Sequence, residues 1–322
     1  MRFVRFDPAP ALAGFGLVTV RDSGSLALGV AGEILREDPA FPLFSGPEDG
    51  ESRRRDRHGT LALIAAREAI EQAGVGPAGA GLAGEGLTGV EGERCGVVIG
   101  TTHASAERNG RYALDLADRD ATLSPSLFVR TTSGAAAADI AFAFKMGGPG
   151  QTFVSGWTAG AEAIAAAARS VSGGTADLVL AGGVETPGPI FARSGPFISE
   201  GAAIAVVTVA APAGRPRLIA YGRGRAAEVH ALHEAGEAAR SFECDTVIVA
   251  NDLEADPWLN AADADEEAFV PPRARRLRVG ELAGALGAVG VVVGCAMSAD
   301  VPGRSLVVAR DPSGEIAALV IG

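Results

Sequence analysis

Apolar residues occur along the chain in short continuous runs that alternate with alanine-rich segments. Many of the runs end at glycine or at a polar residue, as is typical of strands covered on both faces. In the first part of the chain they predict strands up to Gly16 and at residues 17–20, 94–100, 151–155, 177–181 and 200–209. This rhythm predicts an α/β protein with layers of helices on a mainly parallel sheet.

The last third of the chain repeats the same rhythm. Strands are predicted at residues 217–222, 246–250, 305–309 and 316–321, with an acidic helix at 226–240 and a further helix at 281–297. Residues 210–216 then form a connection between two similar halves, 1–210 and a shortened 211–322. A chain of 322 residues is long enough to bury a sizeable core in this arrangement.

Two helices carry further signals. Thr60 is the expected N-cap of a helix at residues 61–73, and Gly74 is its expected C-terminal stop. A single helix is predicted at 125–146, where many small side chains leave room for another helix, a partner subunit or a ligand channel; plain close packing is the alternative. Surface loops are predicted at 37–58 and 76–92.

The stretch 147–185 combines a strand, a tight turn at residues 156–160 and an alanine-rich helix that ends near Val171. Such a turn holds one side chain at a helix N-terminus, where free backbone N–H groups and the helix dipole favour negative charge. Many enzymes hold a nucleophile there. This chain has Trp157, whose indole offers neither a nucleophilic atom nor a useful acid.

Composition narrows the possible functions. A formal charge of -11 argues against nucleic-acid binding, which needs a basic surface. The three cysteines, Cys95, Cys244 and Cys295, are odd in number and lie in apolar segments, so reduced thiols are expected. No apolar run reaches membrane-spanning length and no signal-peptide core is present, which predicts a cytoplasmic protein without a membrane anchor.

Metal and cofactor sites are not predicted. His230 and His233 could share a helix face with Glu234 and hold a metal ion, but an exposed charged helix is the preferred interpretation. His103 follows a glycine turn without a nearby nucleophile pattern, and it is a weak catalytic candidate. The glycine-rich turns do not form a G-x-G-x-x-G dinucleotide motif after a strand, so no cofactor is expected.

An ordered set of motifs resembles the β-ketoacyl synthases of the thiolase-like fold. The matching stretches are residues 93–101 (ERCGVVIGT), 124–129 (SPSLFV), 147–164, 173–185, 200–203 and 284–290 (GALGAVG). The resemblance implies a thiolase-like fold, in which two similar βαβαβ halves form a layered α-β-α-β-α sandwich.

The same resemblance indicates that the catalytic groups of the family are missing. Trp157 stands where the family has its nucleophilic Cys, while Asn251 and Gly284 replace its two catalytic His residues. Residues 298–303 are expected in place of the family's Gly-Phe-Gly-Gly loop before the last strand. General acid and base groups contribute about 10²–10⁴-fold, and the covalent route vanishes without its nucleophile. A chain without them is not expected to condense acyl groups.

The resemblance therefore implies a chain-length factor, a non-catalytic subunit that forms a heterodimer with an active ketosynthase in type II polyketide or polyene biosynthesis. Acyl carrier protein would bind through that partner. The family pattern predicts that one strand pairs across the dimer axis and that other residues form the wall of the acyl tunnel. The strand residues are Thr152, Phe153, Val154 and Ser155, and the tunnel residues are Phe128, Thr132, Ser133, Gly134 and Ala135.

Two alternatives remain open from the sequence. One is a residual enzyme of the same fold that acts on acyl thioesters with other groups. The other is a homodimeric scaffold or ligand-binding protein. Trp157 could equally serve as an aromatic filler of an unused pocket, which is compatible with the chain-length role, and Asn251 could cap a strand or helix end.

Overall fold

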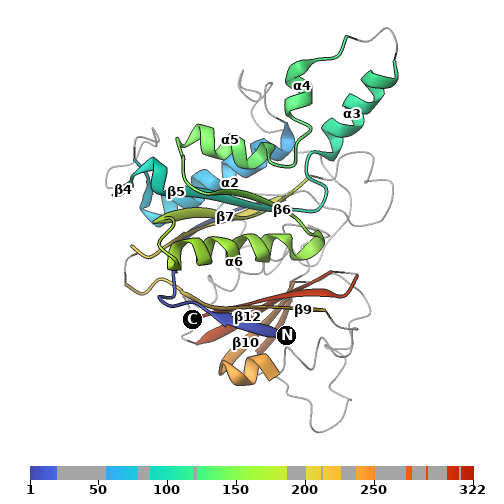
Figure 1. Ribbon diagram of the computed structural model, residues 1–322. Helices are drawn as coiled ribbons and strands as arrows, with labels where there is room; N and C mark the ends of the chain where they lie inside the picture. The colour runs from blue at the N-terminus through green and yellow to red at the C-terminus, as the bar shows by residue number, and fades with distance from the viewer. Residues whose placement is uncertain are drawn as a thin grey trace.

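Two mixed sheets form the frame of the protein (Figure 1). The structure is a computed structural model, described for residues 1–19, 56–78, 88–118, 122–186, 201–211, 213–225, 237–250, 273–277, 288, 303–311 and 313–322. The five-stranded sheet consists, in spatial order, of β2 (Ala11–Thr19), β8 (Gly201–Thr208), β7 (Leu178–Glu185), β5 (Cys95–Thr101) and β6 (Gly150–Val154). The six-stranded sheet consists of β1 (Arg2–Arg5), β9 (Leu218–Arg225), β13 (Glu315–Ile321), β12 (Arg304–Arg310), β10 (Cys244–Ala250) and β11 (Arg273–Leu277).

The two sheets share one topology. When five strands of each sheet are numbered 1 to 5 in chain order, their order in space is 1-5-4-2-3 in both sheets. The five strands are β2, β5, β6, β7 and β8 in one sheet and β9 to β13 in the other. In both sheets the first two neighbouring pairs of this order are antiparallel and the next two are parallel. The predicted internal duplication is therefore present. β1 is an addition, which pairs antiparallel with β9 at the edge of the second sheet.

The expectation of a mainly parallel sheet is wrong, because each sheet is mixed. In each half the last strand returns antiparallel between two strands of the same half, as β8 does between β7 and β2. A continuous apolar run indicates only that both faces of a strand are covered. Because β8 is buried along its whole length, its sequence gives no sign of its direction relative to its neighbours.

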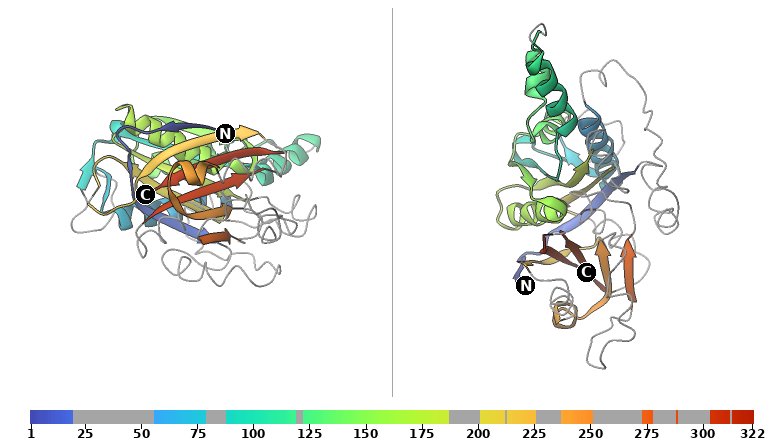
Figure 2. Two further views of the ribbon diagram at one scale, coloured as in Figure 1. Left: turned by 90° about the horizontal axis from the view of Figure 1, so that it is seen from below. Right: turned by 90° about the vertical axis from the view of Figure 1, so that its right-hand side faces the viewer.

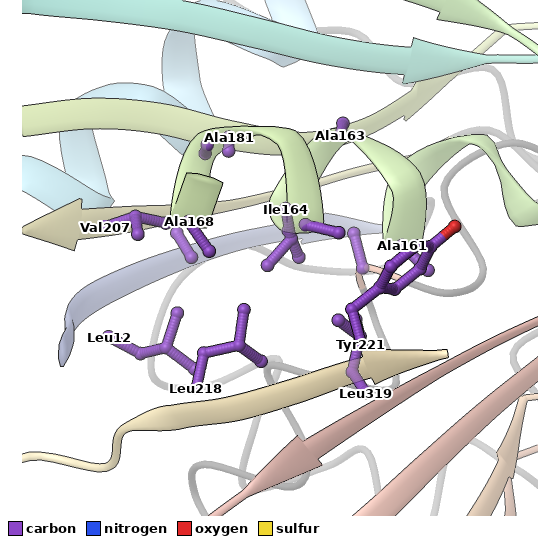
Figure 3. Packing of buried hydrophobic residues seen from close by; sticks show 14 of the residues in the cluster. Leu12, Ala161, Ala163, Ile164, Ala168, Ala181, Val207, Leu218, Tyr221 and Leu319 are labelled. Carbon is purple, nitrogen blue, oxygen red and sulfur yellow. The ribbon is translucent and has the colours of Figure 1, made fainter. Parts of the chain in front are cut away.

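A helix separates the two sheets. α6 (Ala159–Ser172) lies between them (Figure 1), and its alanines allow both sheets to come close. In the close-up of this core, Ile164 of α6 faces Leu218 and Leu319 of the six-stranded sheet, while Ala181 of the other sheet lies on the opposite side of the helix (Figure 3). Burying one such aliphatic side chain contributes about 1.5–3 kcal/mol.

The outer faces of the two sheets are covered as well. α2 (Arg57–Ala73) and α5 (Ala135–Ala143) pack on the outer face of the five-stranded sheet, with Ile70 and Ile140 in that core. Ala238, Ala239 and Phe242 pack on the outer face of the other sheet. The layers are thus α-β-α-β-α, as the thiolase-like prediction requires.

Helix α2 begins one turn earlier than predicted. Its N-cap is Asp56, whose Oδ1 accepts a hydrogen bond from the Gly59 N–H at 2.8 Å. Thr60 is inside the helix, and its hydroxyl donates to the Asp56 carbonyl. A carboxylate is a stronger acceptor than a hydroxyl, so the helix extends to Asp56. The predicted end is confirmed, because Gly74 caps the helix at a φ of 67°.

The single helix predicted at residues 125–146 is wrong. The chain forms α4 (Pro125–Val129), a turn, and α5. In the turn the hydroxyls of Thr131 and Thr132 donate to the carbonyls of Phe128 and Val129. Side-chain bonds of this kind compete with the helical backbone, which ends α4 there. α4 and the preceding α3 (Ala106–Ala117) project together from the body (Figure 2).

Smaller differences concern loops and strand ends. The N-terminal strands are β1 and β2, divided at residues 6–10 rather than after Gly16. The predicted surface loop at 76–92 includes parts of two short paired strands, β3 (Val75–Pro77) and β4 (Thr88–Val90), and is followed by the 3-10 turn η2 (Gly92–Arg94). The predicted helices at 226–240 and 281–297 fall largely outside the described residues, as do most of loop 37–58, Cys295 and the His230 and His233 pair.

Candidate functional site

The turn before α6 has the geometry of a nucleophile seat. β6 ends at Val154, and Ser155 leads into a short 3-10 turn, η3 (Gly156–Thr158), that continues directly into α6. Gly156 has a φ of 70°, in the left-handed region that a side chain makes costly. The residue presented at the start of the helix is Trp157, whose half-buried side chain packs against the core between the sheets.

A carboxylate from the second half occupies this turn. Asp311 follows β12, and its Oδ2 accepts a hydrogen bond from the Trp157 backbone N–H at 3.1 Å. A Cβ at Gly156 would collide with the same oxygen, so glycine is needed there both for its φ and for space. The residue that reaches the turn therefore lies between β12 and the last strand, β13. The prediction had assigned that place to residues 298–303, which precede β12 instead.

Asp311 is held in its charged form. Burial alone would raise the pKa of its carboxyl, but hydrogen bonds from Ser313 and from the Trp157 N–H, together with the charge of Arg310, outweigh burial and lower the pKa. The second oxygen, Oδ1, accepts from the Ser313 N–H at 2.7 Å. Both oxygens of the carboxylate are thus engaged.

A second carboxylate, Glu162, lies in the first turn of α6. Its side chain is buried, and it accepts hydrogen bonds from the hydroxyls of Ser155 (3.0 Å) and Thr158 (2.9 Å). Arg223 of β9 lies 3.5 Å from the same carboxylate. Negative charge is stabilised at a helix N-terminus. Ser155, predicted as part of the pairing strand, therefore lies beyond the strand and positions Glu162.

The described part of the site holds two carboxylates and the two hydroxyls that donate to Glu162, but no thiol. The two described thiols lie elsewhere, since Cys95 and Cys244 are the first residues of β5 and β10. Burial raises the pKa of each thiol to about 11, which leaves them protonated at neutral pH. Asn251 and Gly284, the residues expected in the His positions, lie outside the described residues.

A buried polar cluster that the sequence did not predict lies at the ends of β5 and β7. Glu185 accepts hydrogen bonds from the backbone N–H groups of Thr102 (2.8 Å) and His103 (3.1 Å), and its Oε1 lies 3.0 Å from Nδ1 of His103. Burial alone would raise the pKa of Glu185, but His103 and the Thr102 N–H lower it. His58 of α2 is completely covered and contacts the hydroxyl of Thr186 at 3.0 Å.

The signal for this cluster was present in the chain. His103 follows one buried strand and Glu185 ends another, and β5 and β7 are parallel neighbours. The carboxyl ends of parallel neighbours meet at the same edge of a sheet. What the sequence does not contain is the information that these two strands, 82 residues apart at the contact, are neighbours.

The residues predicted to line the tunnel are only partly brought together. A groove of about 290 Å³ runs between α5 and β6, and its lining includes Gly134 and Thr152. Ala135 is in the core, and Thr132 and Ser133 are exposed in the turn between the helices. Phe128 is 57% exposed on α4, where its ring contacts Tyr112 at a centroid distance of 5.6 Å. Small residues that the prediction did not name, Ala137, Ala138 and Ala141, line the groove instead.

The strand predicted to pair across a dimer axis lies at the edge of its sheet. Among the described strands, β6 pairs only with β5, and the opposite side of β6 carries no strand. Val154 at its end is 53% exposed, while Thr152 and Phe153 are half-buried. An exposed edge strand offers backbone hydrogen-bonding groups to another chain.

Two features bear on membranes and metals. Every helix within the described ranges is too short or too polar to span a bilayer. The same ranges contain no group of three or more His, Cys, Asp or Glu side chains that could hold a metal ion.

Similar solved structures identify the fold class. The chain superposes on a structure described as the ishigamide ketosynthase/chain length factor with a TM-score of 0.72 at 19% identity, covering 97% of this chain and 99% of the other. It superposes with a TM-score of 0.76 at 15% identity, over 99% of both chains, on a complex of a type II PKS acyl-carrier protein with its ketosynthase bound to the hexaketide. The protein thus has the thiolase-like ketosynthase fold.

The sequence comparison identifies the family. The family described as "Beta-ketoacyl synthase, N-terminal domain" matches residues 21–194, which is more than half of the chain. A mycocerosic acid synthase-like polyketide synthase of Mycolicibacterium smegmatis is 31% identical over 180 residues, which are 56% of this chain and 7% of that protein. The chain belongs to the β-ketoacyl synthase family.

Proposed function

We propose that the chain is a non-catalytic chain-length factor. It forms a heterodimer with an active ketosynthase and shapes the acyl tunnel of a type II polyketide or polyene synthase. The observation that carries this proposal is the turn before α6, which keeps the strand, the left-handed glycine and the helix of a nucleophile seat while holding Trp157. Retained geometry without the reacting atom is what an inactive partner of a catalytic homologue requires.

Two surfaces support a partner of the same fold. Among the described residues no strand pairs with the outer side of the edge strand β6, which can therefore offer backbone groups to another chain. The projecting α3 and α4 carry large apolar side chains that are exposed to solvent, namely Leu114, Leu116, Leu123, Phe128 and Val129 on or beside these helices. Exposed apolar side chains gathered in this way are typical of protein interaction surfaces.

The groove between α5 and β6 supports a role in tunnel shape. It is lined by small side chains and lies directly against the edge strand. An acyl chain that reaches the interface from a partner would meet this surface. The net charge of -11 disfavours direct binding of an acidic carrier protein, so acyl carrier protein is proposed to dock on the active partner.

Co-expression tests the proposal. The chain is produced with a candidate active ketosynthase, and size-exclusion chromatography with mass measurement determines whether a one-to-one heterodimer forms. Product length is then compared with and without the chain. A stable heterodimer whose product differs from that of the ketosynthase alone is the expected result. A homodimer that does not bind the ketosynthase contradicts the proposal and favours the homodimeric scaffold as the function.

A second candidate, a residual acyl-thioester enzyme, is favoured by one observation. The carboxylate of Glu185 contacts the imidazole of His103, and such a pair is a recurrent part of acid–base catalysis. Thioester turnover by the isolated chain, abolished in His103→Ala, would establish it. Release of thiol no faster than in buffer excludes it.

A further inference from the structure

The backbone donor at the start of α6 already has a ligand from within the chain. In the turn, the Trp157 N–H points to Asp311, which is 154 residues away in sequence and comes from the other sheet. An unpaired N–H at a helix start favours a negative charge, and the Asp311 carboxylate supplies one. The position where an acyl carbonyl oxygen would be stabilised in a catalytic turn is therefore filled by a side chain.

Asp311 is positioned by its own hairpin. Its backbone N–H donates to the Glu315 carbonyl at 2.8 Å, and its carbonyl accepts from the Gly314 N–H at 2.9 Å. Its Oδ1 is held by the Ser313 N–H, which leaves Oδ2 directed at Trp157. The contact follows from a folded loop and does not depend on a long, flexible side chain.

The charges around the turn oppose a further anion. Asp311 and Glu162 place two carboxylates at one helix start. The described cations near them are Arg223, 3.5 Å from Glu162, and Arg310, which acts on Asp311. A helix N-terminus alone lowers the pKa of a thiol, whereas a neighbouring carboxylate raises it.

We propose that Asp311 is an internal blocking ligand of this turn. It occupies the backbone donor and keeps the site unreactive independently of the Trp157 side chain. A thiol introduced at position 157 would then be a poor nucleophile, because the helix start already stabilises the negative charge of Asp311 and gains little from a thiolate. This inference concerns the single chain and does not depend on the partner proposed above.

Alkylation kinetics test the proposal on the full-length chain. Trp157→Cys is compared with Trp157→Cys/Asp311→Asn, in which the amide keeps the size of the side chain and removes its charge. Iodoacetamide is used between pH 5 and 10; the thiolate attacks the methylene carbon and iodide leaves. Mass spectrometry follows the modified peptide, so that the native cysteines are counted separately.

The expected result is a large difference between these two variants. With Asp311 present, the introduced thiol has a pKa at or above about 8.5, the ordinary value. With Asn, the pKa falls by about one unit or more, and alkylation at pH 7 becomes roughly tenfold faster. Asp177→Asn in the Trp157→Cys background is the control, because Asp177 lies beyond the opposite end of α6. Equal pKa values with Asp and Asn at 311 overturn the proposal.

A second measurement keeps Trp157 in place. Asp311→Ala removes the ligand, and sodium formate can replace its carboxylate. The melting temperature of Asp311→Ala should rise in formate relative to sodium chloride at equal ionic strength, while that of the wild type should not. An Asp311→Ala protein that melts like the wild type, or that gains nothing from formate, contradicts the role of Asp311 as a ligand.

Discussion

At the scale of single residues, the site is defined by Trp157 and its neighbours. The Trp157 side chain carries no nucleophilic atom, and its backbone N–H is bound by Asp311. Gly156 permits both features, since its φ of 70° turns the chain and its missing side chain makes room for the carboxylate. These residues are therefore energetically coupled, and the effect of substituting one of them on the free energy of unfolding should depend on the others.

Replacing Gly156 measures that coupling. Gly156→Ala should destabilise the protein by about 1–2 kcal/mol from its left-handed φ, and by at least about 1 kcal/mol more from the collision with Asp311. Gly174→Ala is a matched control, because Gly174 has the same φ of 70° with no atom within 4 Å of the added Cβ. Urea unfolding gives both values. Equal losses for the two variants would show that Asp311 does not press on Gly156.

His58 makes stability depend on pH. Burial is the main cause that lowers its pKa, against the opposing charges of Glu185, Asp56 and Asp139, and its Nε2 has no hydrogen-bond partner among the residues that the structure describes. Because the folded pKa lies below the unfolded value of about 6.5, the unfolded state binds the extra proton first, and stability falls as pH drops below about 6.5. Arg130, which pairs with Asp139, is the cation facing the cluster, and the imidazole of His103 contacts Glu185.

His58→Gln should remove this dependence. Between pH 6.5 and 5.5 the free energy of unfolding of the wild type should fall by up to about 1 kcal/mol more than that of the variant, because the unfolded imidazole is already half protonated at its ordinary pKa of about 6.5. Urea unfolding at the two pH values measures this difference, and Gln can retain a hydrogen bond to Thr186. Parallel curves for the two proteins would mean that His58 does not titrate in this range.

At the scale of elements, β6 and the α4–α5 break form the surface that we propose for a partner. β6 stays at the edge of its sheet among the described strands, and the break allows α4 to project with α3 instead of extending α5. One long helix at residues 125–146 would not have allowed that arm. The two elements together give the first half its exposed apolar side chains.

A charge on the edge strand tests the interface. Val154→Glu should weaken the proposed heterodimer at least tenfold, about 1.4 kcal/mol, because the carboxylate would be buried against the partner. Val209→Glu, on a residue that is 43% exposed after β8, is the matched control and should leave the affinity unchanged. Analytical ultracentrifugation compares the two. An undiminished affinity of Val154→Glu moves the interface away from β6.

At the scale of the whole molecule, the duplicated topology builds one site from both halves. The first half contributes the turn and α6, and the second contributes Asp311 and Arg223. The groove between α5 and β6 belongs to the first half alone and lies on its open side. An acyl chain in this groove would thus contact residues of the first half, while Asp311 of the second half binds the turn before α6.

Filling the groove should shorten the product of the heterodimer. Ala138→Phe, on an exposed residue of the lining, is preferred to Ala135→Phe, which would overpack the core. Gly134→Phe should act in the same direction. Ala210→Phe, exposed and outside the groove, is the control. Mass spectrometry of the products gives chain length, and an unchanged length for both groove variants separates this groove from the tunnel.

Local features of the protein follow from its sequence alone. Strand positions and the Gly74 cap depend on signals within a few residues, as does the presence of Trp157 at the turn, and the motif order led to the family and its layered fold. Two helix predictions were wrong in their bounds because two local signals competed at each position. Asp56 outcompeted Thr60 as a cap, and threonine hydroxyls interrupted a segment whose alanines favour a helix.

Which distant residues meet depends on the tertiary structure. Asp311 contacts Trp157 across 154 residues, and Glu185 contacts His103 across 82. Such contacts depend on the order and direction of strands in the two sheets, which uniformly apolar runs do not encode, because each strand is covered on both faces. The turn before α6 could therefore be recognised from sequence as a seat without a nucleophile, but the carboxylate that fills it required the fold.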